Sequence, residues 1–466
     1  MSKTWFDKLR LGSCWTALLL CAACSSIPPN TGVAAGAGLY SAYTVEGAGG
    51  AAIARVITRA PACPLIQVDG KSETMHVRAP AETIPTRAGG AQEDAKPASF
   101  PVLACDFDLP AGTAQARIGQ HKLPLPAKEV RRIVVIGDTG CRLKKSDDQY
   151  QACSDDADWP FAQVVRSAAA TKPDLVIHVG DYHYRESPCP SNQPGCAQSP
   201  WGYGFDTWSA DFFEPARPLL AIAPWIFVRG NHETCARGGQ GWFRFLDSGV
   251  WSQARSCNSA ESDTAADYTA PYAVPVGGGT QFIVFDSSKS SGKVYNPTDP
   301  AFLAYSDQLK KVDGLAVQLP QSFFLSHHPV LGLAPGKQGG PKPSVLGLPS
   351  VMRSLHPDRL FGPGITLAMH GHVHLFEALS FASDHPATLV LGNSGSATEG
   401  AMPDQLDNRT LPFADTLIEE YSTRSDYGFA VLERAGSGWD ITEHDKSGLA
   451  VIRCKLERRF LKCAAM

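Results

Sequence analysis

The sequence predicts an α/β protein whose main domain follows a small N-terminal β-rich domain. From Arg131 onward, short apolar runs rich in β-branched residues recur, and helical stretches separate some of them. Runs of this length favour buried strands. Strands that alternate with helices are typical of an α/β domain with ligand sites just beyond the strand ends. The length of 466 residues allows about two or three domains.

The individual elements follow from the same patterns. Strands are expected at 133–136, 174–179, 225–228, 282–285, 322–325, 365–369 and 389–391. A helix is expected from Trp159 to Ala170, with Asp158 as its cap and Pro160 in its first turn. Residues 61–130 contain short apolar runs between Pro, Gly and charged stretches, which predicts the β-rich domain. The main domain then covers 131–466, and the Gly/Ala-rich segment 25–60 is expected to be a tether.

Composition excludes several classes of protein. Hydrophobic residues make up 43% and charged residues 19% of the chain, which is a globular balance and not that of a disordered or fibrous protein. With 42 basic and 46 acidic residues, the net charge of −4 offers no basic footprint, so no nucleic-acid binding is expected.

The first 24 residues have the pattern of a lipoprotein-type signal peptide. Lys3, Lys8 and Arg10 precede the apolar stretch 11–23, which is too short for a permanent membrane span. Ala22-Ala23-Cys24 resembles a bacterial lipobox, although Cys21 stands where that motif usually has Leu. We therefore expect export to the bacterial cell envelope, as a periplasmic or outer-membrane lipoprotein. A lipid on Cys24 would be its membrane anchor, and cleavage with release is the alternative.

The chain has 13 cysteines, a large and odd number. Cys14 and Cys21 fall in the signal and Cys24 at its end, which leaves an even set. The expected disulfides join Cys63 to Cys105, Cys141 to Cys153, Cys189 to Cys196, Cys235 to Cys257, and Cys454 to Cys463. These loop-closing spacings suit an oxidising compartment. Metal binding by thiolates is the competing interpretation, but no CxxC pair occurs after the signal.

Polar motifs follow five of the expected strands. They are GDTG with Asp138, GDYHY with Asp181 and Tyr184, GNHE with Asn231 and His232, SHHP with His327 and His328, and HGHVH with His372 and His374. Side chains at successive strand ends converge at one edge of a sheet. Hard oxygen donors mixed with imidazoles suit a pair of first-row metal ions rather than a structural zinc.

The order of these motifs resembles that of the calcineurin-like metallophosphoesterases, and within them the purple acid phosphatases. The resemblance runs from about Arg131 to the C-terminus and implies a four-layer α/β/β/α sandwich. General members of the superfamily begin with DxH, whereas Gly140 stands at the histidine position here. The purple acid phosphatase pattern instead has a tyrosine three residues after the bridging aspartate, where Tyr184 follows Asp181.

The resemblance implies two metal sites that share one carboxylate. Asp138, Tyr184 and His374 would bind the first metal, expected to be Fe³⁺ because a phenolate is a hard anionic donor. Asn231, His327 and His372 would bind a divalent Fe, Zn or Mn ion. Asp181 would bridge the two metals.

Further residues receive roles from the same resemblance. His232 would protonate the leaving group, and Glu233 would either orient it or make a structural hydrogen bond. Asn231 and His328 are candidates for binding the substrate, with packing as the alternative for His328. His183 and His370 are assigned to packing or to contacts that support the ligands, and not to metal binding. For Arg185 and Arg237, surface salt bridges are expected rather than substrate binding, and the Gly/Pro-rich run from Leu331 to Pro349 is expected to be a flexible loop over the site.

The expected function is hydrolysis of small-molecule phosphate monoesters by a metal-dependent enzyme of acid phosphatase type. A metal-bound hydroxide would attack phosphorus while His232 protonates the leaving group. The alternatives are a phosphodiesterase of the same superfamily, which would share the metal ligands, and an envelope-anchored metal-binding protein without catalysis.

Overall fold

The computed structural model describes residues 38–87, 95–336, 340–411 and 416–466. The predicted signal over 1–24 and its Cys24 lie outside these residues. The described residues all belong to one compact unit. Among them, no helix combines the length and the apolar character that crossing a membrane would need.

The first of two large sheets has parallel strands at its centre and antiparallel strands on both sides. Its order is β29 (Phe460–Ala465), β28 (Ala450–Glu457), β27 (Gly438–Asp445), β26 (Gly428–Ala435), β11 (Arg132–Ile136), β14 (Leu175–His178), β15 (Trp225–Phe227), β1 (Leu39–Glu46), β2 (Ala52–Thr58), β8 (Leu103–Leu109) and β5 (His76–Ala79). Strands β11, β14 and β15 are mutually parallel, so their carboxyl ends share one edge.

The second large sheet has the same kind of parallel centre. Its order is β16 (Tyr272–Pro275), β17 (Thr280–Val284), β18 (Gln321–Leu325), β21 (Ile365–His370), β23 (Ala387–Leu391), β22 (Phe376–Phe381), β25 (Thr416–Arg424) and β24 (Thr410–Leu411). Strands β17, β18, β21 and β23 are parallel. All seven predicted strand segments therefore fall on strands of the two sheets.

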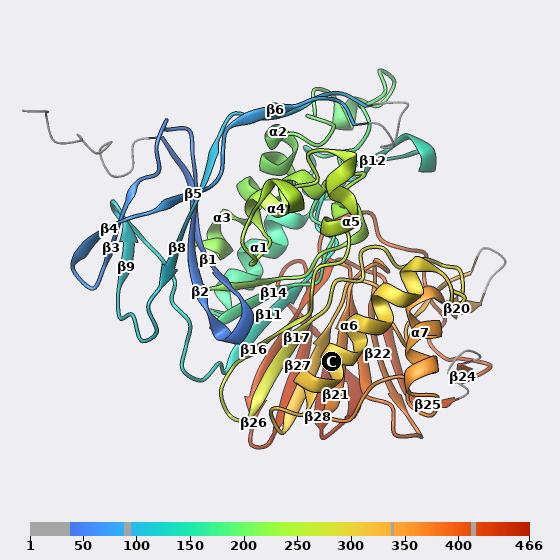
Figure 1. Ribbon diagram of the computed structural model, residues 1–466. Coiled ribbons are helices and arrows are strands. Elements are labelled where there is room, and N and C mark those ends of the chain that lie inside the picture. The colour runs from blue at the N-terminus through green and yellow to red at the C-terminus, as the bar shows by residue number, and fades with distance from the viewer. Residues whose placement is uncertain (1–37, 88–94, 337–339, 412–415) are drawn as a thin grey trace, which may run out of the picture. The chain divides into compact units, whose positions relative to one another are not determined.

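The two sheets pack face to face and helices cover their outer faces (Figure 1). Ile133 and Ile177 of the first sheet share a core with Phe282 and Phe323 of the second. The helices are α1 (Phe161–Ala170), α2 (Phe205–Trp208), α3 (Glu214–Leu220), α4 (Gly239–Phe245) and α5 (Asp263–Ala266) over the first sheet, and α6 (Pro300–Ala316) and α7 (Gly347–Leu355) over the second. This arrangement confirms the α/β/β/α sandwich.

The N-terminal β-rich region begins earlier than predicted. The expected tether over 25–60 is wrong from Leu39 onward, because β1 and β2 are strands of the first large sheet. Val45 of β1 pairs in parallel with Trp225 of β15, and Tyr43 and Ile57 are fully buried. The abundant Gly and Ala of this segment conceal the apolar residues that fix these strands in the sheet.

Small sheets complete the described chain. In the N-terminal region they comprise β3 (Leu65–Val68), β4 (Lys71–Thr74), β9 (Ala116–Ile118) and β10 (His121–Lys122), with β6 (Glu82–Ile84) and β7 (Ala98–Phe100) as a separate pair. The others are the pairs β12 (Leu143–Lys144) with β13 (Gln149–Tyr150), and β19 (Leu333–Pro335) with β20 (Pro341–Pro343). The predicted boundary at 130/131 falls between β10 and β11.

Two local predictions have different outcomes. Helix α1 starts at Phe161 with Pro160 at the cap position, so the predicted cap is wrong. The carboxylate of Asp158 instead accepts the Ala152 N–H at 2.6 Å, in the loop before the helix.

The disulfide prediction is confirmed for Cys63–Cys105, Cys141–Cys153, Cys189–Cys196, Cys235–Cys257 and Cys454–Cys463.

Candidate metal centre

The five predicted motifs occupy the carboxyl ends of parallel strands from both sheets. Asp138 follows β11, Asp181 and Tyr184 follow β14, and Asn231 follows β15. From the second sheet, His327 follows β18, and His372 and His374 follow β21. Because the two sheets pack face to face, side chains from both reach one site.

One group of donor atoms surrounds the phenol oxygen of Tyr184. Its Oη lies 2.8 Å from Asp138 Oδ1, 3.0 Å from Asp181 Oδ2 and 2.9 Å from His374 Nε2. All four side chains are buried. These residues are the set predicted for the first metal, together with the predicted bridge.

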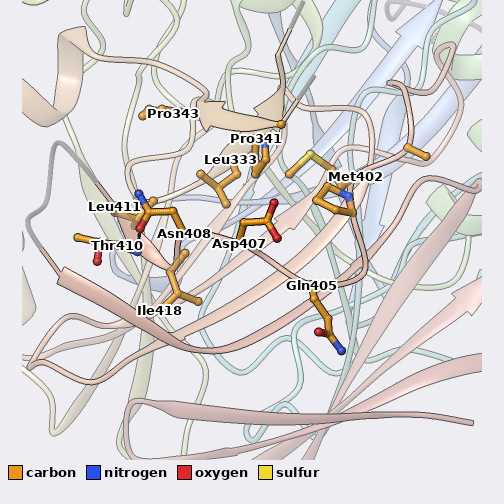
Figure 2. Close-up of a pocket in the computed structure, with 13 residues that line it drawn as sticks. Leu333, Pro341, Pro343, Met402, Gln405, Asp407, Asn408, Thr410, Leu411 and Ile418 are labelled. Atoms are coloured by element: carbon orange, nitrogen blue, oxygen red, sulfur yellow. Dashed lines mark hydrogen bonds between the residues drawn. The ribbon is translucent and has the colours of Figure 1, made fainter. Parts of the chain in front are cut away.

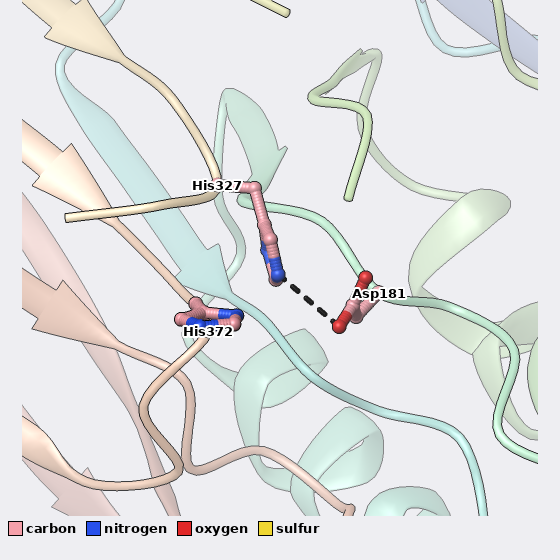
Figure 3. Close-up of side chains that lie close together, drawn as sticks. All are labelled: Asp181, His327 and His372. Atoms are coloured by element: carbon pink, nitrogen blue, oxygen red, sulfur yellow. Dashed lines mark ion pairs between the residues drawn. The ribbon is translucent and has the colours of Figure 1, made fainter. Parts of the chain in front are cut away.

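A second group shares the carboxylate of Asp181 with the first. His327 Nε2 lies 3.0 Å from Asn231 Oδ1 and 3.1 Å from Asp181 Oδ2, and His372 Nδ1 lies 3.0 Å from the same Asn231 oxygen. Figure 3 shows His327 and His372 directed toward Asp181, with the ion pair between Asp181 and His327. Asp181 Oδ2 is thus an atom common to both groups.

The hydrogen-bond partners of the two donor groups show which atoms carry lone pairs and can therefore bind cations. His327 Nδ1 must donate to the carbonyl of Val179 at 3.0 Å, and His374 Nδ1 to that of Ala397 at 2.6 Å, because a carbonyl only accepts. In the neutral rings, which bind metals, both Nε2 atoms therefore present lone pairs. Tyr184 has one hydrogen for three acceptors. Lone pairs held about 3 Å apart repel each other unless a cation lies between them, so the donor set fits two metal ions.

The pKa values of two candidate ligands also favour cations in the site. Burial disfavours a charged His327, yet the carboxylate of Asp181 raises the pKa of this imidazole to about 9, so Asp181 favours a cation on His327 Nε2, either a proton or a metal ion. Burial, assisted by the charges of Asp138 and Asp181, raises the pKa of the Tyr184 phenol well above its ordinary value. Only a strongly charged cation would therefore stabilise Tyr184 as a phenolate.

The backbone of the site is strained where the ligands project from the strands. Asp138, Asp181 and His372 have φ values of 54°, 59° and 72°, and such conformations cost roughly 1–3 kcal/mol each in non-glycine residues. Two glycines allow the close approach of these loops. A Cβ on Gly230 would lie 2.0 Å from Asp181 Oδ1, and one on Gly371 would lie 2.5 Å from Asp138 Oδ2.

His232 lies beside the first group of donors. Its ring packs against that of Tyr184 with the centroids 3.9 Å apart. Its Nδ1 donates to the carbonyl of His183 at 2.9 Å, so Nε2 is the ring nitrogen on the side of the ligands, 3.8 Å from Asp181 Oδ2. Burial lowers the pKa of His232 well below its ordinary value, and the charge of Arg237 adds to this effect.

Glu233 anchors the ligand loop and makes no described hydrogen bond to the His232 ring. Its two carboxylate oxygens accept the backbone N–H groups of Gly230, Asp181, Tyr182 and His183 at 2.9–3.3 Å. Of the two predicted roles, these contacts correspond to the structural hydrogen bond. The orientation of His232 comes from the His183 carbonyl instead.

Two side chains close to His232, those of Arg237 and Glu186, lie outside the sequence motifs that mark the site. Arg237 Nη2 lies 2.8 Å from His232 Nε2, and this guanidinium binds Glu186 through Nε and Nη2 at 2.5 and 2.7 Å. Glu186 Oε1 is also 3.5 Å from His232 Nδ1. Arg237 forms a salt bridge with Glu186, and Arg185 forms one with Asp211. Both arginines are buried or nearly so, whereas the prediction was for salt bridges at the surface.

The other histidines lie around the ligands. The His328 ring is 4.3 Å from that of His372, and its Nδ1 is 3.3 Å from Ser287 Oγ, so this candidate for substrate binding is close to the second group. His183 Nε2 donates to the Gly202 carbonyl, and His370 Nδ1 contacts Ser326 Oγ. Both are buried, as the packing role requires.

A separate cavity lies under the Gly/Pro-rich run. Strands β19 and β20 form a short pair there, and Leu333, Pro341 and Pro343 line a cavity of about 610 Å³ together with Met402 and Ile418 (Figure 2). None of the predicted ligands lines this cavity. In its described part, the run expected to be a flexible loop over the site therefore contains a paired hairpin.

Comparison with known proteins identifies the class to which this fold and site belong. The profile described as Calcineurin-like phosphoesterase matches residues 131–376, so the chain belongs to the calcineurin-like phosphoesterase family and is a metal-dependent phosphoester hydrolase. No curated protein sequence matches the chain.

A solved structure shares the fold at low sequence identity. A purple acid phosphatase from yellow lupin (Lupinus luteus) seeds is 14% identical, with a TM-score of 0.52 over 92% of this chain and 74% of that one. A structure of PhoD is 10% identical, with a TM-score of 0.49 over 94% of this chain and 93% of that one.

Proposed function

We propose that this chain hydrolyses phosphate monoesters with a dinuclear centre of Fe³⁺ and a divalent metal. The observation that carries the proposal is the phenol oxygen of Tyr184 among Asp138 Oδ1, Asp181 Oδ2 and His374 Nε2 at 2.8–3.0 Å. A phenolate is a hard anionic donor suited to a trivalent ion. Asn231, His327 and His372 would bind the divalent metal, and Asp181 would be shared.

When bound, the two cations supply Lewis acidity to the phosphoryl oxygens and lower the pKa of water. The side chains supply the rest. In its doubly protonated form, which its low pKa restricts to acidic pH, His232 would donate the Nε2 proton to the leaving oxygen, while the His183 carbonyl fixes the orientation of the ring. Asn231 and His328 would contact the phosphoryl group beside the second metal site.

Two measurements test this function. Purified protein should contain two metal ions per chain and show a tyrosinate-to-iron absorption band in the visible, with an acidic optimum for hydrolysis. An optimum above about pH 8 without that band would contradict the iron assignment but not the phosphoesterase activity. Turnover of para-nitrophenyl phosphate should exceed that of bis(para-nitrophenyl) phosphate, and the reverse order would identify a diesterase.

We also infer that the protein functions in the bacterial cell envelope, anchored through Cys24. The five disulfides support an oxidising compartment. Mass spectrometry of the N-terminal peptide of membrane-extracted protein should find a lipid on Cys24. A released, unacylated mature chain would contradict the anchor.

A further inference from the structure

A pair of basic side chains lies beside the candidate metal centre and takes no part in binding the metals. Arg142 comes directly after Cys141 in the loop that follows β11, and Lys144 belongs to β12. The guanidinium of Arg142 lies 5.2 Å from the centre of the Tyr184 ring. The side chains of Arg142 and Lys144 remain 15% and 25% exposed, so both are accessible from solvent.

The backbone joins this basic pair rigidly to the ligand loop. The Leu143 N–H donates to the Tyr184 carbonyl at 3.0 Å, and the Leu143 carbonyl accepts the Glu186 N–H at 3.1 Å. The disulfide between Cys141 and Cys153 closes the loop at its base. The pair is therefore held in place before any ligand arrives, which reduces the entropic cost of binding.

The charges of the pair are only partly balanced by neighbouring carboxylates. Lys144 Nζ lies 3.3 Å from Asp147 Oδ2, and Arg142 Nη1 lies 3.9 Å from the same oxygen. Two cations thus share one carboxylate that is itself 36% exposed. Arg142 Nη1 also donates to Gln149, but its Nε has no hydrogen-bond partner among the described residues. An unpaired donor on a partly buried guanidinium is suited to a carboxylate or phosphate.

The guanidinium of Arg142 and the ring of His232, the proposed acid, both lie against the Tyr184 ring, at 5.2 Å and 3.9 Å from its centre. Arg237 is already bound bidentately by Glu186. Arg142 and Lys144 are therefore cations of the adjacent loop that can still bind a ligand.

We propose that Arg142 and Lys144 bind a second anionic group on the alcohol part of the substrate, so that the preferred substrates are phosphate monoesters whose leaving group carries a carboxylate or a further phosphate. This specificity rests on the proposed monoesterase function. It adds to that function the chemical class of the leaving group.

The test compares esters that differ only in one remote charge. With metal-loaded protein, kcat/KM for 4-carboxyphenyl phosphate should exceed that for phenyl phosphate by about tenfold or more, which corresponds to about 1.4 kcal/mol. In the Arg142→Gln/Lys144→Gln double variant this ratio should fall to near one, and Arg142→Lys should retain part of it. Lys310→Gln, on the exposed face of α6, should keep the wild-type ratio.

Binding without turnover provides an independent readout. Calorimetry should show that 4-carboxyphenylphosphonate binds about tenfold more tightly than phenylphosphonate, and that the double variant loses this difference. The rigid ring keeps the carboxylate away from the atoms that bind the phosphonate. A wild-type ratio near one, or a preference that survives in the double variant, would overturn the proposal. If neither ester is hydrolysed, the proposed function itself fails, whereas hydrolysis of both at equal rates refutes only the specificity.

Discussion

The phenol oxygen of Tyr184 lies 3.0 Å from Oδ2 of Asp181, three positions earlier in the same loop. The positive φ of Asp181 turns the chain so that both side chains face the strand ends of the opposite sheet. The phenol oxygen thereby lies at the centre of the donor set formed with Asp138 and His374.

Replacing Tyr184 by Phe should remove the first metal while leaving the fold intact. The ring can still pack against His232, but the central donor atom is lost. We expect a loss of one metal equivalent and of the visible band, with kcat reduced by roughly 100-fold or more. Metal analysis and absorption spectroscopy measure both effects.

Tyr182→Phe is the matched control for that variant. The Tyr182 hydroxyl donates to the Val228 carbonyl at 2.9 Å and contacts no predicted ligand. It should lower the free energy of unfolding by about 1 kcal/mol and keep both metals. Equal metal loss in the two variants would contradict the assignment of Tyr184.

Replacing His232 by Ala should impair turnover according to the leaving group. An alkyl phosphate needs a proton on its departing oxygen, so its kcat should fall by about 10²–10⁴-fold. Para-nitrophenolate departs without protonation, so that ester should be affected much less. Metal content should stay at the wild-type value. Equal losses with the two esters would exclude His232 as the acid.

Replacing Glu233 by Gln should destabilise the ligand loop. The wild-type carboxylate accepts four backbone N–H groups, and an amide nitrogen in place of one oxygen cannot accept those directed at it. We expect a loss of roughly 1–3 kcal/mol in the free energy of unfolding, with weaker metal binding because Asp181 is held by this contact. Chemical denaturation and metal titration measure the two effects, and unchanged values in both would refute the anchoring role.

Glu46, at the end of β1, should make stability depend on pH. Burial raises its pKa to about 7 from an ordinary value of 4.5, so the folded protein binds the proton more tightly than the unfolded chain. Stability is therefore highest below about pH 4.5 and falls until about pH 7, by roughly 3 kcal/mol for this group.

Glu46→Gln should remove this decline and raise the melting temperature at pH 8. Melting curves at pH 5 and pH 8 measure the change, with Glu73→Gln on the exposed strand β4 as the control. A pH profile that is identical in wild type and Glu46→Gln would contradict the prediction.

Asp106 should be essential for the contact between the N-terminal β-rich region and α4. Burial opposes its charge, but Arg55 and Arg78 hold the pKa of its carboxyl below the usual range. Both guanidiniums also donate to carbonyls at the end of α4, including those of Phe243 and Phe245. Asp106→Asn leaves two buried cations with only the carboxylate of Asp247, 3.6 Å from Arg78, as counter-charge, and we expect a loss of about 3–5 kcal/mol. Denaturation at neutral pH tests this, and a loss under about 1 kcal/mol would contradict it.

The sequence by itself determined the class of fold, the residues proposed as ligands and the disulfides. Apolar runs of strand length followed by Asp, Asn, Tyr and His residues identify both the sheets and their functional edge. This information is local, because each motif directly follows its own strand. The five cysteine pairs were predictable for a similar reason, since four of them join near neighbours in the chain.

Only the tertiary structure decided which groups contact one another across the chain. The Gly/Ala composition before residue 60 conceals β1 and β2, whose strands form because β15 and β8 offer their edges to them. Loops that are distant in sequence meet in space at the site. They bring the ion pair of Glu186 and Arg237 to His232, and Arg142 together with Lys144 to Tyr184. Charge and hydrogen-bond partners depend on such long-range packing, which no local pattern of residues encodes.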